Sequence, residues 1–257
     1  MSNQPDVGVE RPAVADLLDK RADLLACLAD GARSQRDLRE ELDRSRSTVY
    51  KAVTELAEAG LIAESAEGYE LTGVGRLAWR RYDDYQARLD RLVAAEPLLN
   101  AIPDDRRVPL STFEHGRVIV PGRHAPERPL DHLEALAEDV DTLRCFSPAG
   151  MPRYFSNIHE RVADDDLTAK LVIEDDGIDR VRATYDRFEA AVDDSAFDVR
   201  IATGKLPFAI VVFDEAELGL FAYDDGTLVG ATFCDDDAAL TWGERLFDRV
   251  HEQATPV

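Results

Sequence analysis

Apolar residues in the N-terminal part of the chain recur every three or four positions, the spacing that places them on one face of an α-helix. A leucine-rich stripe predicts a first helix over residues 13–29, followed by Gly31. A short second helix is predicted over residues 35–41, with Ser34 as its N-cap. The beginning of the chain is therefore expected to form a pair of helices.

A third helix and a β-hairpin are expected next. Ser45 can cap a longer helix, and Gly60 just past its end suits the left-handed conformation that often terminates helices. The apolar face of this helix carries Val49, Val53 and Leu56. Two short strands are expected over residues 61–64 and 69–71, with a polar turn containing Gly68 between them. The predicted order is three helices and then a hairpin.

A long helix with a heptad-like seam is predicted after the hairpin. Thr72 can cap this helix, which extends to about residue 95. The seam steps by four, three, four and three through Ala78, Tyr82, Tyr85, Leu89 and Leu92. Such a seam can pair two subunits, which predicts a homodimer through residues 73–96, but it can also pack on its own domain. Pro97 ends the seam, and residues 98–109 are expected to be a linker.

The rest of the chain alternates between strand and helix patterns. Strands are predicted over residues 108–113, 118–120, 142–146, 169–173, 198–202, 208–213, 217–223 and 227–234. Helices are predicted over residues 130–140, 153–162, 178–192 and 238–251. Alternation followed by consecutive strands predicts a mixed α/β layered sheet with parallel and antiparallel parts.

The polar face of the predicted third helix carries side chains suited to DNA. Its N-terminal half presents hydrogen-bond donors and a flat ring, from Arg46, Ser47, Tyr50 and Lys51. In helix-turn-helix proteins this end of the recognition helix enters the major groove. An amphipathic helix pair with a cationic face can also be a solvated helical hairpin and nothing more. The β-hairpin that follows favours the DNA-binding interpretation.

The stretch SRSTVYKAVTELAEAGLI, with the hairpin after it, resembles the winged-helix domain of archaeal and bacterial transcription regulators. The resemblance implies that Arg46, Ser47, Tyr50 and Lys51 read or flank bases. It also implies that Arg36 and Arg44 contact phosphates, and that the hairpin from Glu64 to Tyr69 lies at the DNA backbone. The expected partner is double-stranded DNA.

The charge of the chain is strongly acidic and unevenly distributed. The net charge is −22, from 52 acidic and 30 basic residues. Residues 11–82 carry 12 basic and 13 acidic residues, whereas residues 83–257 carry 18 and 37. The proposed DNA reader is thus nearly neutral. Low lysine content and runs of aspartate resemble proteins of extremely halophilic archaea, where a screening length of about 3 Å at molar salt leaves only short-range contacts with DNA.

Cysteine usage and hydropathy point to a cytoplasmic protein. No metal site or cofactor is expected, because the sequence contains no dinucleotide-binding, Walker, His-Glu-x-x-His or EF-hand signature. Three cysteines at Cys27, Cys145 and Cys234 are widely spaced, which argues against a disulfide framework or zinc ribbon and suggests buried structural thiols. No targeting peptide and no run of about 18 apolar residues is present, so no membrane association is expected.

The C-terminal stretch DDGTLVGATFCDDDAALTWGERLFDRV, with the alternating pattern before it, resembles the phospholipase-D-like sensor domain of archaeal TrmB-type regulators and their haloarchaeal relatives. Phospholipase D enzymes require a His-x-Lys signature. Lysine does not stand two residues after any of the five histidines, His115, His124, His132, His159 and His251. The resemblance therefore implies binding of a small effector, with sugars bound in the TrmB case, and no catalytic residues.

Three segments at expected strand ends are candidates for binding an effector. Ser147, Arg153 and Tyr154 lie between a strand and a helix, where backbone amides and Arg153 could receive an anion. Lys205 stands beside a glycine between two strands, and His115 and Arg117 flank another strand. Each segment also has a purely structural explanation, because glycine and proline shape turns and Arg117 can pair with a nearby aspartate.

The expected organisation has four parts. They are a flexible tail (1–12), a winged helix-turn-helix domain (13–72), a dimerisation helix with a linker (73–107) and an α/β effector-sensing domain (108–257). The chain is expected to be a sequence-specific, homodimeric transcription regulator and not an enzyme. Two alternatives remain open: a phosphoester- or nucleotide-processing enzyme targeted by a winged helix, and a protein-interaction module that does not bind DNA.

Overall fold

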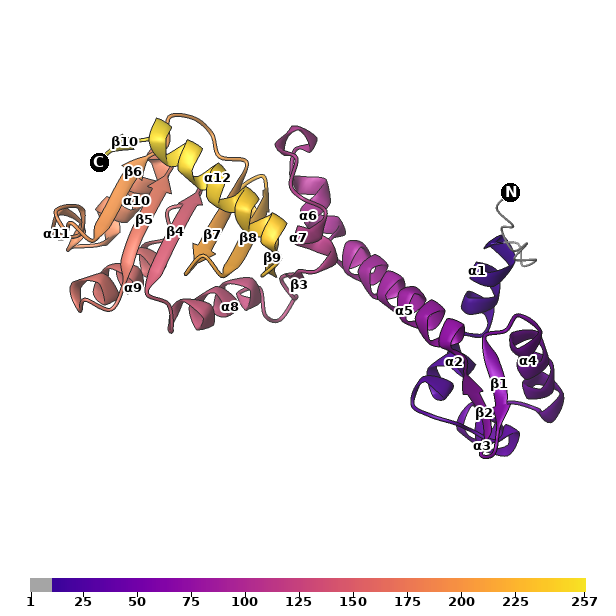
Figure 1. The fold of residues 1–257 in the computed structure, drawn as a ribbon. Helices are drawn as coiled ribbons and strands as arrows, with labels where there is room; N and C mark the ends of the chain where they lie inside the picture. Colours follow the sequence, from indigo (N-terminus) through magenta and orange to yellow (C-terminus); the bar gives the residue numbers. More distant parts are fainter. Residues whose placement is uncertain (1–10) are drawn as a thin grey trace, which may run out of the picture. The chain divides into compact units, whose positions relative to one another are not determined.

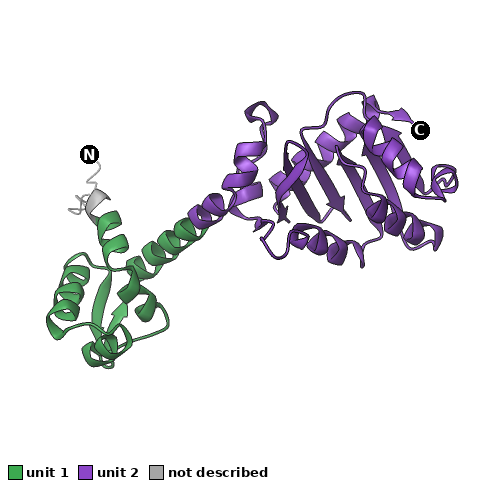
Figure 2. Cartoon of the chain, turned by 180° about the vertical axis from the view of Figure 1, so that it is seen from behind, with its two compact units in different colours: residues 1–87 green, residues 88–257 purple. Residues whose placement is uncertain are grey.

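The computed structural model describes residues 11–257, which divide into two compact units that meet between Ala87 and Arg88 (Figure 2). Residues 1–10, most of the expected tail, lie outside the described part. No helix in the described part is both long and apolar enough to cross a membrane.

The first unit contains the predicted order of helices followed by a hairpin. Its elements are α1 (Arg11–Lys20), α2 (Ala22–Ala29), α3 (Gln35–Glu41), α4 (Arg46–Glu58), β1 (Ile62–Ser65), β2 (Gly68–Leu71) and the first part of α5 (Gly73–Ala94). The strands β1 and β2 pair antiparallel. Side chains from α1 to α4, from both strands and from Leu61 just before β1 form one apolar core, which includes Leu25, Leu38 and Leu56.

The predicted helix caps of the first unit are confirmed. The Ser34 hydroxyl accepts a hydrogen bond from the Asp37 amide, and the Asp37 carboxylate accepts one from the Ser34 amide. The Ser45 hydroxyl accepts from the Thr48 amide at 3.2 Å. Gly60 has a φ of +71°, and its amide and that of Leu61 bond back to carbonyls in the last turn of α4. These local signals fix where α3 and α4 begin and end.

The predicted single helix over residues 13–29 is wrong, because the chain bends at Arg21. Arg21 has a φ of −120° and separates α1 from α2. Its guanidinium donates two hydrogen bonds, at 2.7 and 3.0 Å, to the Glu55 carboxylate on α4. The bend and this contact depend on a residue that is distant in the sequence. The apolar spacing of residues 13–29 continues through the break and therefore does not reveal it.

The second unit is built on an eight-stranded sheet in the order β10-β6-β5-β4-β7-β8-β9-β3 within the described residues. The strands are β3 (Arg117–Ile119), β4 (Thr142–Ser147), β5 (Thr168–Ile173), β6 (Phe197–Ile201), β7 (Phe208–Phe213), β8 (Glu217–Asp224), β9 (Thr227–Cys234) and β10 (Thr255–Pro256). The β4–β5 and β5–β6 pairs are parallel and the other pairs are antiparallel. This confirms the predicted mixed α/β sheet.

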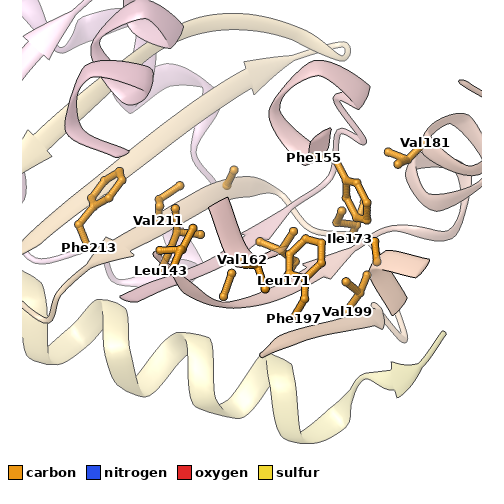
Figure 3. Packing of buried hydrophobic residues seen from close by; sticks show 14 of the residues in the cluster. Leu143, Phe155, Val162, Leu171, Ile173, Val181, Phe197, Val199, Val211 and Phe213 are labelled. Atoms are coloured by element: carbon orange, nitrogen blue, oxygen red, sulfur yellow. The ribbon is translucent and has the colours of Figure 1, made fainter. Parts of the chain in front are cut away.

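Helices cover both faces of this sheet and bury a separate core on each (Figure 1). They are α6 (Glu96–Ala101), α7 (Ser111–Glu114), α8 (Arg128–Ala137), α9 (Pro152–Ala163), α10 (Asp175–Thr184), α11 (Phe188–Val192) and α12 (Asp237–Gln253). Alternate strand residues point to opposite faces, so Leu171 and Val211 join the core with α9 to α11, as Figure 3 shows, whereas Val172 and Val212 join the core with α12.

Residues 98–109 were predicted to be a linker, which is wrong for the first half of the segment. Pro97 stands in the first turn of α6 and opens a helix instead of ending one. Leu98 is fully buried in the core beside α12, where its side chain lies against Gly230 of β9. The sequence pattern could not show this contact, which joins residues more than a hundred positions apart.

Two further predicted elements are corrected. Residues 108–113 do not form a strand, because the chain turns at Pro109 into the short helix α7 and buries Phe113. The predicted helix over residues 178–192 is interrupted at Tyr185, which leaves helical geometry with φ −107° and ψ 104°. There the Tyr185 hydroxyl lies 2.8 Å from Nδ1 of buried His159, and its ring packs edge-on against Phe155.

Candidate functional site

The N-terminal half of α4 presents a polar surface in the first unit. Arg46, Ser47, Tyr50 and Lys51 are all exposed, and Tyr50 is 63% exposed although its side chain is large and aromatic. The opposite face of the helix is buried in the core through Val49, Ala52, Val53 and Leu56. Amphipathicity therefore fixes which face points to solvent.

Hydrogen bonds connect the side chains at the first turn of α4. The Ser45 hydroxyl lies 2.9 Å from the Ser47 hydroxyl and 2.8 Å from the Thr48 hydroxyl, besides accepting from the Thr48 amide. Three hydroxyl groups thus gather where the helix amides leave partial positive charge. This is a surface of donors, which suits phosphate oxygens and base edges.

The carboxylate of Glu55, one turn from Lys51 on α4, is already paired. Glu55 accepts hydrogen bonds from Arg21 and from Lys20, and the Arg21 contact, with Lys20, lowers the pKa of its carboxyl. Lys51 lies at 4.0 Å from the same carboxylate and keeps 70% of its side chain exposed. Because Arg21 and Lys20 satisfy Glu55, Lys51 remains available to an anionic partner.

The other basic side chains expected at DNA are exposed but lie in weak ion pairs. Arg36 contacts Glu40 at 2.9 Å, and Arg44 contacts Asp23 at 3.4 Å. Exposed pairs of this kind contribute about 0–1 kcal/mol, so a phosphate can replace the carboxylate.

The hairpin β1–β2 has acidic side chains and no basic one. Glu64, Glu67 and Glu70 lie between residues 62 and 71, and no lysine or arginine does. Phosphates repel carboxylates, so this charge argues against the expected hairpin contact with the DNA backbone. We assign no DNA contact to the hairpin.

A cavity of about 270 Å³ lies in the second unit between the sheet and the helices α8 and α9. Strands β4, β5, β7 and β8 supply one wall through residues such as Leu143, Leu171 and Val211, whose side chains are visible in Figure 3. The facing wall comes from α8 and α9, and the segment after β4 completes it. Most of the lining is apolar.

Polar groups of the cavity lie in two places. At the helix side, Arg153 donates to the Glu134 carboxylate at 3.0 Å, and Asn157 lies 3.5 Å from the same carboxylate. At the sheet side, burial raises the pKa of both the Cys145 thiol and the Tyr223 hydroxyl to about 12. These two groups are therefore neutral near pH 7.

The candidate effector residues do not all converge. Ser147, Arg153 and Tyr154 line the cavity. His115 instead lies 3.1 Å from Asp236, and Arg117 shares a shallow surface hollow with it. Lys205 donates to the Glu174 carboxylate at 2.6 Å, away from the cavity lining.

Sequence reasoning missed the cavity residues that neighbouring elements bring in. They include Cys145, Glu134, Asn157 and Tyr223. Strand alternation could have placed Cys145 and Tyr223 on one sheet face, but no local signal indicates a gap between that face and its helices. No group of three or more His, Cys, Asp or Glu side chains that could hold a metal is found from residue 11 onward.

Comparison with known families gives two matches. Residues 13–93 match a family described as the HVO_A0261 N-terminal domain. Residues 126–253 match the middle domain of the methanogenesis regulatory protein FilR1. The chain is also 23% identical over 254 residues to the methanogenesis regulatory protein FilR1 of Methanothrix harundinacea (strain 6Ac), which covers 93% of this chain and 56% of that protein. The chain thus spans about half the length of this relative.

Solved structures with partial similarity include TrmBL2 and NucT. TrmBL2, an archaeal chromatin protein with a novel mode of DNA binding, has a TM-score of 0.45 and 14% identity, covering 96% of this chain and 100% of that one. NucT from Helicobacter pylori has a TM-score of 0.43 and 8% identity, covering 55% and 98%.

Proposed function

We propose that the chain is a sequence-specific regulator that binds double-stranded DNA through a winged helix-turn-helix, with α4 as the recognition helix. In this proposal the α4 face enters the major groove through Arg46, Ser47, Tyr50 and Lys51. Arg36 and Arg44 contact phosphates. The chain acts as a homodimer through α5, and the cavity of the second unit receives a small effector.

The exposed face of α4 is the observation that carries the proposal. Its apolar side is buried, so the four polar residues have no role in the core of their unit. An exposed tyrosine beside arginine and lysine, at the N-terminal end of a capped helix, matches the composition of major-groove readers. A solvated helix face does not require a tyrosine that is 63% exposed.

The charge distribution supports DNA as the partner. The net charge of −22 opposes association with DNA, but residues 11–82 carry 12 basic and 13 acidic residues. Within this nearly neutral unit, Glu55 is paired by Lys20 and Arg21 behind the recognition face. The carboxylate of Glu55, which lies one turn from Lys51 on α4, is therefore compensated.

A catalytic role for the second unit has less support. Phosphoester transfer of the phospholipase D type needs a histidine and a lysine two residues apart, and none of the five histidines has that partner. Among them, His159 is buried and lies 2.8 Å from the Tyr185 hydroxyl, where it stacks on Phe197. Its position is that of a core residue.

The test compares Lys51→Glu with Lys170→Glu in the full chain. Lys51 lies on the α4 face, whereas Lys170 is exposed on β5 in the second unit, so both variants change the net charge equally. Binding sites are first selected from a random pool of duplex DNA with the unmodified protein. Affinity for the selected duplex is then measured by fluorescence anisotropy.

Lys51→Glu is expected to weaken binding by about 10- to 100-fold or more, because a base or phosphate contact contributes about 1–3 kcal/mol and glutamate adds repulsion. Lys170→Glu should keep the affinity within about twofold, since only long-range charge changes. Equal affinities for both variants, with unchanged circular dichroism, would contradict the assignment of α4.

A further inference from the structure

We infer that the cavity between the sheet and the helices α8 and α9 binds a small, uncharged and mostly apolar molecule, not a sugar or an anion. This inference deepens the proposed function, since it names the chemical class of the effector. It also replaces the expectation that Arg153 and nearby amides receive an anion.

The size of the cavity fits a compact ligand. A dry cavity of about 150 Å³ lined by aliphatic and aromatic side chains binds benzene. The volume here is about 270 Å³, which suits a molecule of two or three rings or a short chain. A sheet with a fully packed face would leave no such space, because protein interiors contain few voids larger than a water molecule.

The walls exclude a strongly hydrated ligand. Leucine, isoleucine, valine, alanine and phenylalanine side chains from four strands and two helices make up most of the lining. A sugar would lose hydrogen bonds to water at each hydroxyl group and would find few polar partners among these side chains. An unpaired hydroxyl group costs about 1–3 kcal/mol in a protein interior.

The cations at the cavity are already engaged. Arg153 donates to Glu134 at 3.0 Å and keeps 71% of its side chain exposed, so it lies toward solvent. Arg161 donates to the backbone carbonyls of Ala137, Val140 and Asp166. An anionic ligand would have to enter an apolar space beside Glu134 without a free positive partner, which opposes its binding.

A few neutral polar groups can orient an apolar ligand. Tyr223 and Cys145 lie on the sheet side, and their high pKa values keep both protonated at neutral pH. The Ser147 hydroxyl donates to the Ala149 carbonyl at 3.0 Å and accepts from the Ala149 amide at 3.1 Å. An apolar pocket with a small number of such groups is the usual composition of a small-molecule site.

The test uses two fluorescent probes that share one aromatic skeleton. N-phenyl-1-naphthylamine is uncharged at neutral pH, and 8-anilinonaphthalene-1-sulfonate adds a sulfonate group. Each probe is titrated into the full chain, and calorimetry with glucose and with glucose 6-phosphate covers the polar ligands. The neutral probe is expected to bind at least about tenfold tighter than the sulfonate, and the two sugars are expected not to bind.

Two variants fill the cavity from opposite walls. Ala209→Leu adds carbon atoms from β7, and Ala137→Leu adds them from α8. Each variant should weaken binding of the neutral probe by about tenfold or more, because the new side chain fills the space of the probe. Thermal stability should be kept, because that space is empty in the unliganded protein. Ala163→Leu makes the same change at an exposed position of α9 and should leave binding unchanged.

Three results would overturn the inference: tighter binding of the sulfonate or of a sugar, no binding of the neutral probe, or full binding of that probe by both folded cavity variants. DNA affinity of the unliganded protein is measured separately. If the protein binds the neutral probe but not DNA, the proposed function has failed. If it binds DNA but not the probe, the inference about the cavity has failed.

Discussion

Asp236 shows how much one side chain can organise in the second unit. Its carboxylate caps α12 by accepting from the amides of Ala238 and Ala239 at 3.0 and 3.2 Å. It also lies 3.1 Å from Nδ1 of His115, near the start of β3. The neighbouring Ser111 hydroxyl, followed by the α12 amides and His115, lowers the pKa of this carboxyl from 3.8 to about 2.

Asp236→Ala is expected to destabilise the second unit by about 0.5–2 kcal/mol at pH 7, the usual cost of losing an N-cap. The folded-state pKa is depressed, so the stabilisation is fully present above the unfolded value near 3.8 and is lost as pH falls toward 2. Urea unfolding in steps from pH 7 to pH 3 measures the difference in the free energy of unfolding between the variant and the unmodified protein. If this difference does not become smaller toward pH 3, the charge of the carboxylate is not what stabilises the unmodified protein.

At the scale of elements, α6 is an integral part of the sheet core. The helix is short, with Pro97 in its first turn, but Leu98 is fully buried against β8 and β9. A methyl group added at Gly230 would come within 2.5 Å of Leu98, which shows how closely this helix and β9 approach. The segment that follows α5 therefore anchors that helix to the second unit.

Leu98→Ala should lower the free energy of unfolding of the second unit by about 2–5 kcal/mol, because it leaves a cavity in a packed core. Leu99→Ala, at a neighbouring side chain that is 40% exposed, should change it by no more than about 0.5 kcal/mol. Urea unfolding followed by Trp242 fluorescence in a Trp79→Phe background reports the second unit alone. Equal effects of the two variants would mean that α6 is not packed as described.

For the whole molecule, α5 belongs to both compact units, and its seam is only partly available to a second copy. Ala78 and Tyr82 pack against the core of the first unit, whereas Leu92 packs against a core of the second. Between them, Tyr85 is 55% exposed and Leu89 is 36% exposed. The proposed dimer contact therefore narrows to the middle of the predicted heptad seam.

The double variant Tyr85→Glu, Leu89→Glu is expected to be monomeric, because glutamates facing each other across a seam repel and leave apolar contacts unmade. Sedimentation equilibrium gives the mass at several concentrations. Arg80→Glu, roughly 140° around the helix from Tyr85, is the control and should remain a dimer. A double variant with the mass of the unmodified protein would exclude α5 as the dimer contact.

Local interactions within a few residues determined the features that the sequence revealed by itself. Caps at Ser34, Ser45 and Thr72, the glycine at residue 60 and strand alternation in the second unit act between neighbours, so they remain legible in the chain. The polar face of α4 could be predicted for the same reason, since burial of one helix face leaves the other to solvent.

Tertiary structure alone decided the features that depend on distant partners. Arg21 meets Glu55 of α4, Leu98 meets β9, and Asp236 meets His115 across intervals that periodicity does not span. The cavity is likewise a property of two layers that do not fill the space between them. Of the candidate effector residues, only Ser147, Arg153 and Tyr154 are among those that line the cavity. The packing of α8 and α9 on the sheet determines which side chains surround the cavity, and position at a strand end does not.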